Sequence, residues 1–576
     1  MSRTRCVGAV LGIACMIGSS FGAPRAQVAT STKGMVSSAS PIASAIGRDV
    51  LADGGNAVDA TVATALAMAV TWPEAGNIGG GGFMMIAPPG KPVECVDYRE
   101  TAPANCGPNS FVKQEDRHCA QMAGTPGTVR GLWLAHQKYG KLPWRRLVEP
   151  AVKVAAKGFE IDHHLASSLR MAFNTSGIDD QKQYAELHRV YGRPGGGEWK
   201  TGDTLKLPDL ARTLQRIADE GPDGFYSGET ARLIVAEMQA GGGSITADDL
   251  AKYEAKIRSS VHATVWGHEI YGPPPPSSGG ATLLLMLQML EARGWKASSA
   301  ALSGKPWTVD QLHLVAEAAR RGFRERAAAL GDPDFVATPN WIGDAKFAAK
   351  LASTIDPQHA TSSRGIAGDI KITAGPYESE QTTHFSVVDG DGLAVSNTYT
   401  LEESFGSFIV VRGAGFILNN EMGDFNWRPG YTNEEGAVGT QANQIAPRKR
   451  MLSSQTPVIV RRDGKNVLVT GSPGGRTIIN TVACVLTQRL ALGRSLAEAI
   501  EAPRIHQQWF PDRIQYEAWA EELLEPQLAD LTARGHKVEN RGANQGAAHS
   551  IEIDPTTGVI TGVADWRRGG AAVGVE

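Results

Sequence analysis

Two threonines in one predicted β-hairpin are the residues of this sequence that are best placed to do chemistry. Thr382 opens an alternating segment rich in β-branched and aromatic residues; turn residues follow at 389–392, and a second alternating segment ends at Thr400. This pattern predicts a hairpin. If residues 390–391 form a two-residue loop, Thr382 faces Tyr399 and Thr400 lies one step away. The hairpin would then hold two hydroxyls together at a strand end, although threonine is also simply common in strands.

A threonine hydroxyl needs a base before it can act as a nucleophile. At a free N-terminus the α-amine, with a pKa of roughly 7.7–8.0, can be that base, and the branched Cβ limits the positions of the hydroxyl. Thr382 is internal, so it gains this amine only if the Gln381–Thr382 bond is cut. His384 points to the same strand face without necessarily reaching the hydroxyl, and we interpret it as structural.

The elements that would position this hairpin are helices and strands in mixed order. Residues 40–72 are predicted to be largely helical, with a break at Gly54 and Gly55. The glycines of 76–82 stand between a helix and a strand, the reverse of the strand–loop–helix order of a phosphate-binding loop. We therefore exclude nucleotide binding and expect the glycines to allow close backbone packing.

Composition is that of an ordinary globular protein. The 576 residues are 42% hydrophobic and 20% charged, with a net charge of -3. No basic run or basic–aromatic stripe is present, so nucleic acid is not an expected partner.

The N-terminus has the pattern of a secretory signal. Basic residues precede an apolar stretch at 6–17, and small residues follow up to Gly22. The sequence predicts a signal peptide over 1–22 and export to the periplasm or the medium, since the stretch is too short to span a bilayer. A lipoprotein site at Cys15 and a buried N-terminal helix stay open as alternatives.

Four cysteines remain after the predicted cleavage. Cys106 and Cys119 flank a polar loop, and an oxidising compartment would permit a disulfide between them. Cys484 lies in an apolar helical stretch and is predicted to be a core residue. The spacing of the cysteines is not that of a zinc site.

Several motifs in one order carry a resemblance to a known family. They are Gly54 to Ala60, Ala75 to Phe83, Asp97 to Pro103, Gln381 to Asp389, Leu418 to Met422, Leu452 to Ser454 and Gly471 to Gly475. From about residue 34 to the C-terminus, the chain resembles the γ-glutamyltransferase (glutathione hydrolase) proenzymes of the N-terminal-nucleophile hydrolase superfamily.

The resemblance implies a self-cleaving precursor. The Thr382 hydroxyl would attack the Gln381 carbonyl, giving a large subunit of residues 23–381 and a small catalytic subunit of residues 382–576 that pair as a heterodimer. Thr382 would then carry the γ-glutamyl group as an acyl-enzyme. Thr400 matches the threonine that hydrogen-bonds the new N-terminus, and Gly474 and Gly475 match the oxyanion hole.

The substrate residues also follow from the resemblance. Arg99 matches the residue that pairs with the substrate α-carboxylate, where a planar guanidinium suits bidentate binding. Ser453 and Ser454 match serines that add donors to the same carboxylate. The positions that take the α-ammonium are Glu402, Glu421 and Asp424.

This sequence departs from the family pattern at three places. Glu402 stands where many members have Asn and others have Glu, and Gly423 replaces the first residue of a common Asp pair. The loop 426–446 has the length of the family lid, but Glu435 occupies the place of a frequent gating aromatic residue, for which Tyr431 or Trp427 could substitute.

The implied fold is an α+β four-layer αββα sandwich in which both subunits form one globule. No cofactor or metal is expected, because amine, hydroxyl and oxyanion donors supply the chemistry. The implied partners are small molecules: glutathione, other γ-glutamyl compounds, and amino-acid or dipeptide acceptors.

Two other functions compete with this one. A related acylase would remove a glutaryl-type side chain from a β-lactam nucleus and would have no ammonium to bind; three retained carboxylates argue for a γ-glutamyl substrate. A periplasmic glutamyl-peptide binding protein would never mature and would stay a single chain.

Overall fold

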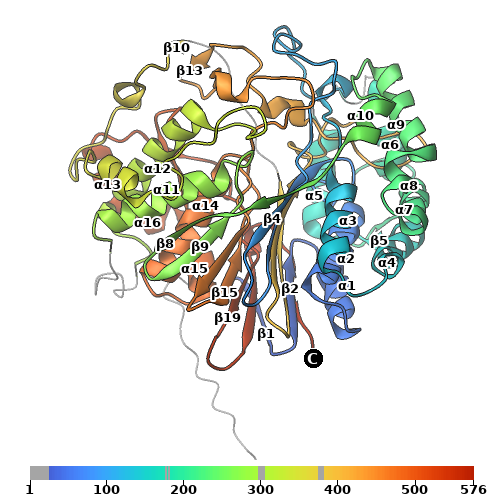
Figure 1. The fold of residues 1–576 in the computed structure, drawn as a ribbon, viewed down its shortest axis with the longest axis horizontal. Coiled ribbons are helices and arrows are strands. Elements are labelled where there is room, and N and C mark those ends of the chain that lie inside the picture. Colours follow the sequence, from blue (N-terminus) through green and yellow to red (C-terminus); the bar gives the residue numbers. More distant parts are fainter. Residues whose placement is uncertain (1–24, 176–177, 179–181, 296–304, 374–381) are drawn as a thin grey trace, which may run out of the picture.

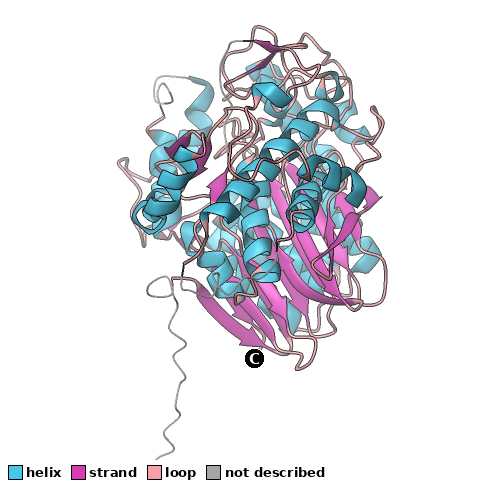
Figure 2. Cartoon of the chain, turned by 90° about the vertical axis from the view of Figure 1, so that its left-hand side faces the viewer, coloured by secondary structure: helices cyan, strands magenta, loops and turns pink. Residues whose placement is uncertain are grey.

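Two stacked β-sheets lie between two layers of helices (Figures 1 and 2). The structure is a computed structural model that describes residues 25–175, 178, 182–295, 305–373 and 382–576. The predicted four-layer αββα sandwich is therefore confirmed.

The first sheet holds the threonine hairpin at its centre, and all of its neighbouring strands are antiparallel. In spatial order its strands are β21 (Ala571–Gly574), β2 (Gly34–Ser38), β11 (Thr383–Asp389), β12 (Ala394–Thr400), β3 (Gly81–Ala87), β4 (Glu94–Asp97) and β7 (Lys256–Ser259). Strands from both ends of the chain thus flank the hairpin.

The second sheet is also antiparallel throughout. In spatial order its strands are β1 (Gln27–Ser31), β20 (Ile560–Ala564), β19 (Ser550–Ile553), β15 (Lys465–Thr470), β14 (Val458–Arg462), β9 (His268–Gly272) and β8 (Val261–Val265). Apolar side chains of both sheets, among them Phe83, Val388 and Ile459, form the core between them.

The helical layer over the first sheet begins with α1 (Pro41–Ala52) and α2 (Ala57–Thr71), separated at Gly54, whose φ is +89°. The predicted break is therefore confirmed. Every residue of α2 is buried, and a capping box between Asn56 and Asp59 fixes its start. The layer continues with α3 (Thr128–Tyr139), α4 (Trp144–Lys157), α5 (His163–Phe173), α6 (Ala185–Tyr191), α7 (Pro208–Glu220), α8 (Asp223–Tyr226), α9 (Gly228–Gly241) and α10 (Ala247–Lys252).

The opposite layer covers the second sheet (left side of Figure 1). It contains α11 (Gly279–Ala292), α12 (Val309–Ala329), α13 (Ala345–Ala352), α14 (Thr477–Leu486), α15 (Leu496–Glu501) and α16 (Glu521–Ala533). Cys484 is buried in α14 among apolar side chains, as predicted.

Short strands complete the chain. They are the parallel pair β10 (Ile372–Thr373) and β13 (Thr432–Asn433), the pair β5 (Phe159–Glu160) and β6 (Thr204–Leu205), and the group β16 (Ile505–His506), β17 (Ile514–Tyr516) and β18 (Val538–Asn540).

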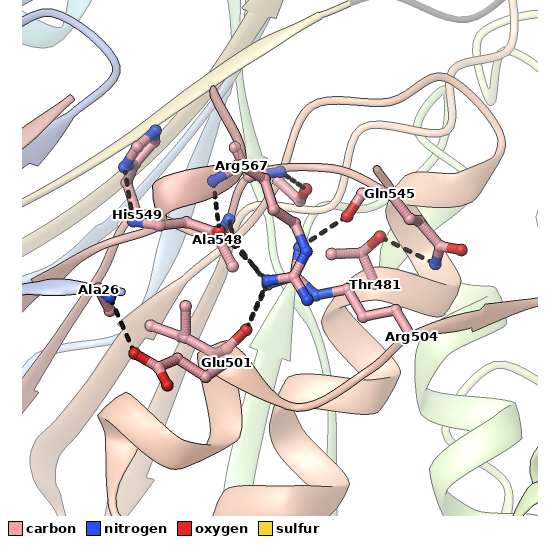
Figure 3. A network of polar contacts seen from close by, with 12 residues as sticks. Ala26, Thr481, Glu501, Arg504, Gln545, Ala548, His549 and Arg567 are labelled. Atoms are coloured by element: carbon pink, nitrogen blue, oxygen red, sulfur yellow. Dashed lines mark hydrogen bonds and ion pairs between the residues drawn. The ribbon is translucent and has the colours of Figure 1, made fainter. Parts of the chain in front are cut away.

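A buried ion cluster ties the strands of the C-terminal region together; we call it the C-terminal ion cluster and define it as Arg504, Glu517, Asp565 and Arg567 (Figure 3 labels the two arginines). Arg504 Nη2 lies 2.5 Å from Asp565 Oδ2, and Arg567 Nε lies 2.6 Å from Glu517 Oε1. Arg504 also donates to the main-chain carbonyl of Gln545 at 2.7 Å. Two cations thus face two carboxylates.

Candidate active site

The hairpin register differs by one residue from the prediction. Thr383, not Thr382, pairs with Tyr399. Continuing that register places Thr382 opposite Thr400 at the end of the hairpin, and both side chains are buried. The two hydroxyl-bearing residues are therefore direct neighbours across the strands rather than one step apart.

The turn explains this shift. The loop has three residues rather than two, because the Asp389 main-chain N–H bonds the Leu393 carbonyl at 3.1 Å. The Asp389 carboxylate accepts from the N–H groups of Asp391 and Leu393 at 3.0 Å, and Gly392 has a φ of +84°. A left-handed glycine closing a three-residue loop is a common hairpin turn, and it changes the register by one residue.

One narrow pocket brings most of the predicted site residues together. It is lined by Arg99, Thr382, Thr400, Glu402, Glu421, Asp424, Ser453, Ser454, Gln455, Gly475, Arg476 and Ile478. Its space of about 30 Å³ holds about two water molecules at most. Gly474 is the neighbour of a lining residue, and Gln381 lies outside the described residues.

Arg99 lies at the centre of this pocket and is fully buried. Its guanidinium contacts Glu421 Oε2 at 2.5 Å and Glu100 Oε2 at 3.4 Å, and it also pairs with Asp424. The Tyr253 hydroxyl donates to the Arg99 carbonyl at 2.9 Å and anchors the backbone. Burial lowers the pKa of Arg99, but the carboxylates around it raise that pKa on balance, so the side chain stays cationic.

The carboxylates outnumber this cation. Burial raises the pKa of Glu402 and Glu421 well above the usual value, and Asp424 adds to the rise in both. Burial also raises the pKa of Glu100 to about 7. Arg99 alone therefore does not neutralise the acidic groups that contact it, and these carboxylates can accept a ligand cation.

Gly423 shapes the position of the Glu402 carboxylate. A Cβ at Gly423 would lie 2.4 Å from Glu402 Oε1 and 2.5 Å from Oε2, so any other residue there would require the Glu402 carboxylate to shift. Gly423 and Glu402 are thus linked. Because glycine has no side chain, the carboxylate of Glu402 fits beside residue 423.

Ser453 and Ser454 are held by hydrogen bonds to residues outside the pocket lining. Ser453 N–H bonds the Pro276 carbonyl at 2.9 Å, and the Ser453 carbonyl accepts from Ser278 N–H at 2.7 Å. Arg326 donates to Ser454 Oγ at 3.1 Å. These contacts fix both predicted serines at the pocket wall.

Gly474 and Gly475 precede α14 with φ values of +127° and +54°. Both are left-handed conformations that favour glycine. Their carbonyls accept from the N–H groups of Thr477 and Ile478 at 3.0 and 3.2 Å, as the helix begins. Main-chain donors at a helix start suit a developing negative charge.

Comparison with known proteins identifies the family. A family model described as gamma-glutamyltranspeptidase matches residues 43–575. The glutathione hydrolase proenzyme of Pseudomonas aeruginosa is 41% identical over 559 residues, 94% of each chain. The chain belongs to the gamma-glutamyltranspeptidase family. The resemblance drawn from the sequence is thereby confirmed.

Acylases are also similar to this gamma-glutamyltranspeptidase family member. The acylase ACY 1 proenzyme of Pseudomonas sp. (strain SE83) is 32% identical over 564 residues, 95% of this chain and 94% of the relative. The solved cephalosporin acylase from Bacillus halodurans has a TM-score of 0.83 over 96% of this chain and 98% of its own, at 23% identity. That second likeness supports the fold alone.

The loop 426–446 of this gamma-glutamyltranspeptidase family member is held at its two ends and in its middle. Asn426 N–H bonds the Asn443 carbonyl at 2.9 Å, and Arg476 donates to the Gly436 carbonyl at 2.6 Å. Glu435 is exposed. Trp427 and Tyr431 line a neighbouring cavity rather than the Thr382 pocket, together with Gln114, Glu115, Arg117, Gly423, Phe425, Arg428, Ala437 and Val438.

Two residues near the site were missed by the sequence analysis. Arg476 lines the pocket and directly follows Gly474 and Gly475, so its position in the chain was a usable signal. Arg117 contacts Glu402 from a polar loop, and its sequence context offers no such signal.

His384 and the cysteines take structural positions. His384 is fully buried, with Nδ1 at 2.9 Å from Thr398 Oγ1, and burial lowers its pKa well below the usual value. Cys106 and Cys119 are free thiols, so the hypothesis of a disulfide between them is wrong: Cys119 Sγ is instead turned to the Asp116 carbonyl at 3.4 Å.

Within the described ranges, no group of three or more His, Cys, Asp or Glu side chains is arranged to hold a metal ion. Over the same part of the chain, no helix combines the length and apolar character that crossing a membrane requires.

Proposed function

We propose that this protein is a self-processing γ-glutamyl hydrolase and transferase that uses Thr382 as its nucleophile. The observation that supports this best is the shared pocket: Thr382 lies with the buried Arg99 and with the carboxylates of Glu402, Glu421 and Asp424. A γ-glutamyl group carries the complementary charges, an α-carboxylate and an α-ammonium. Glutathione is the donor that the glutathione hydrolase relative suggests.

In maturation, the Thr382 hydroxyl oxygen attacks the Gln381 carbonyl carbon. The peptide nitrogen leaves as the Thr382 α-amine and takes up a proton, and an ester joins the two pieces. Water then hydrolyses that ester, leaving a carboxylate at Gln381 and a free hydroxyl on Thr382. The products are residues 23–381 and 382–576, after removal of the signal peptide 1–22.

In turnover, the new α-amine accepts the hydroxyl proton while the oxygen attacks the γ-carbonyl of the donor. The N–H groups of Gly474 and Gly475 stabilise the oxyanion, and Thr400 positions the amine. The leaving amine receives the proton. Water or an acceptor amine then attacks the acyl-enzyme and releases glutamate or a new γ-glutamyl compound.

Substrate binding exchanges ion pairs in the pocket. The α-carboxylate takes the place of Asp424 and Glu421 on the Arg99 guanidinium, with Ser453 and Ser454 as further donors. The carboxylates released in this way, together with Glu402, receive the α-ammonium. The exchange accounts for the small volume of the pocket and for the ion pairs of Arg99 inside it.

The relative named as an acylase makes the glutaryl-type acylase the second candidate. A glutaryl group has no ammonium, so it would leave the excess buried carboxylates without a cation, which is costly. The non-processed binding protein is the third candidate. We also propose that the protein acts in the periplasm or outside the cell.

The test is intact mass and N-terminal sequencing of the purified protein after incubation at neutral pH, beside Thr382→Ala. The expected result is two pieces with a new terminus at Thr382, absent from the variant. A second assay compares γ-glutamyl and glutaryl anilides. An uncut wild-type chain overturns the proposal; faster glutaryl cleavage replaces it by the acylase.

A further inference from the structure

Arg117 is a cation on the outer side of the acidic pocket. It lies in a polar loop, its side chain is 18% exposed, and its Nη1 is 3.2 Å from Glu402 Oε1 and 3.3 Å from Glu403 Oε1. It also lines the neighbouring cavity, whereas Glu402 lines the Thr382 pocket. The Arg117–Glu402 pair therefore forms part of the wall between the two cavities.

The guanidinium of Arg117 is held in place from several sides. It lies over the Trp427 ring, 4.9 Å from the centroid, a favourable cation–π position. The next residue, His118, contacts Glu403 Oε2 at 2.8 Å and stacks on Phe408. The loop that presents the cation is therefore anchored rather than loosely attached.

Arg117 engages only one oxygen of the Glu402 carboxylate. Glu402 is 8% exposed, and within the described residues its Oε2 has no hydrogen-bond partner. A buried acceptor without a donor is unfavourable unless a ligand supplies one. Because Glu402 lines the Thr382 pocket, an α-ammonium bound there is the donor that fits Oε2.

The surroundings make Glu402 dependent on this cation. Burial, Asp424 and Glu403 raise its pKa, whereas Arg117 and the more distant Arg99 lower it. Glu100 and Glu421 add further acidic groups to the same pocket. Without Arg117, Glu402 would be protonated to a higher pH and would lose the charge that attracts an ammonium.

We propose that Arg117 is a specificity-determining positioning residue: it holds the Glu402 carboxylate against Gly423, charged and with Oε2 turned to the ligand, so that the pocket selects acyl donors with a cationic α-amino group. This inference rests on the proposed function and deepens it. It gives the adjacent pair Glu402 and Gly423 a third member that acts on substrate only through Glu402.

The test compares γ-glutamyl-p-nitroanilide with glutaryl-p-nitroanilide over pH 5–9, using wild type, Arg117→Leu, Arg117→Gln and Arg117→Lys. Arg428→Leu is the matched control, because Arg428 lines the same cavity over Tyr431 and the structure shows no carboxylate bonded to it within the described residues. Competitive inhibition by L-glutamate and by glutarate measures the same preference without turnover. Intact mass verifies that each variant is cut.

Both neutral variants should lower kcat/KM for the γ-glutamyl substrate about 10- to 100-fold, mainly through KM, and move its acid limb to higher pH. Glutarate inhibition and glutaryl turnover should stay within about 3-fold. Arg117→Lys should keep the wild-type acid limb, and Arg428→Leu should leave the preference unchanged.

Equal loss on both ligands, or an unchanged acid limb in the neutral variants, overturns the role of Arg117 and leaves the proposed function standing. A wild type that is not cut, or that prefers glutarate, overturns the proposed function and this inference together. If Arg117→Leu does not fold, Arg117→Gln and Arg117→Lys carry the comparison.

Discussion

The Arg99 pocket and the C-terminal ion cluster are both buried and both built from arginines and carboxylates, yet they are balanced differently. In the C-terminal ion cluster two arginines face two acids, and although burial raises the pKa of Asp565 and Glu517, the arginines lower both on balance. In the pocket, Arg99 faces Glu100, Glu421 and Asp424, and the pKa of Glu421 is raised. A balanced cluster stabilises a fold, whereas an unbalanced one is prepared for a ligand.

Arg99→Met should give the largest contrast between the two regions, because it should reduce activity strongly and stability little. We expect kcat/KM for a γ-glutamyl anilide to fall at least about 10³-fold, because the substrate carboxylate loses its charged partner. The melting temperature should change by less than about 3 °C, since Glu100 and Glu421, whose pKa values are already raised, take up protons when the arginine is removed. Steady-state kinetics and calorimetry measure both. A loss below 10-fold would show that Arg99 does not bind the substrate.

Arg567→Met should lower the stability of the fold and leave substrate binding nearly unchanged. It leaves Glu517 buried without its main cation, and breaking such a pair costs about 3–5 kcal/mol of stability. Urea unfolding in the Thr382→Ala background, where a single chain unfolds, gives the value. The double variant Arg567→Met/Glu517→Gln should recover part of it. In the processed enzyme KM should stay within about 2-fold; a large change in KM would contradict a purely structural role.

The C-terminal ion cluster should set the pH dependence of stability, whereas the Arg99 pocket should set the pH dependence of substrate binding. The pKa of Asp565 is lower in the folded state than the unfolded value of about 3.9, so its contribution to stability is present above that value and is lost as pH falls below it. The pKa of Glu402 and Glu421 is raised, so both carboxylates lose their charge as the pH falls, and ammonium binding should weaken at a less acidic pH than the one at which Asp565 is protonated.

As the pH is lowered, activity should therefore fall while the protein is still folded. A pH–rate profile beside unfolding curves at pH 7, 5, 4 and 3.5 tests this, with Asp565→Asn as the control that flattens the stability curve alone. Coincident loss of activity and fold would remove the distinction between the two clusters.

Local patterns were enough to find the hairpin and the helix break, whereas the pocket residues came from the family resemblance. Alternation in 382–400 predicts the strands, but the register depends on how Asp389 caps its loop, and that side-chain choice is not visible in the alternation. Arg117 belongs to no periodic element, so only the folded loop places it beside Glu402. The four layers came from the family resemblance, because pattern alone indicates only mixed α and β.

The order of strands in the first sheet has a consequence for how the protein can be made. β2 and β3, from the N-terminal part, pair directly with β11 and β12, and β2 also pairs with β21 at the other end of the chain. A chain cut before Thr382 therefore consists of two interwoven pieces, neither of which owns a complete sheet. Expressed separately, each would present open strand edges that favour aggregation. We therefore expect two co-expressed pieces to assemble less efficiently than a chain that folds first and is cut afterwards.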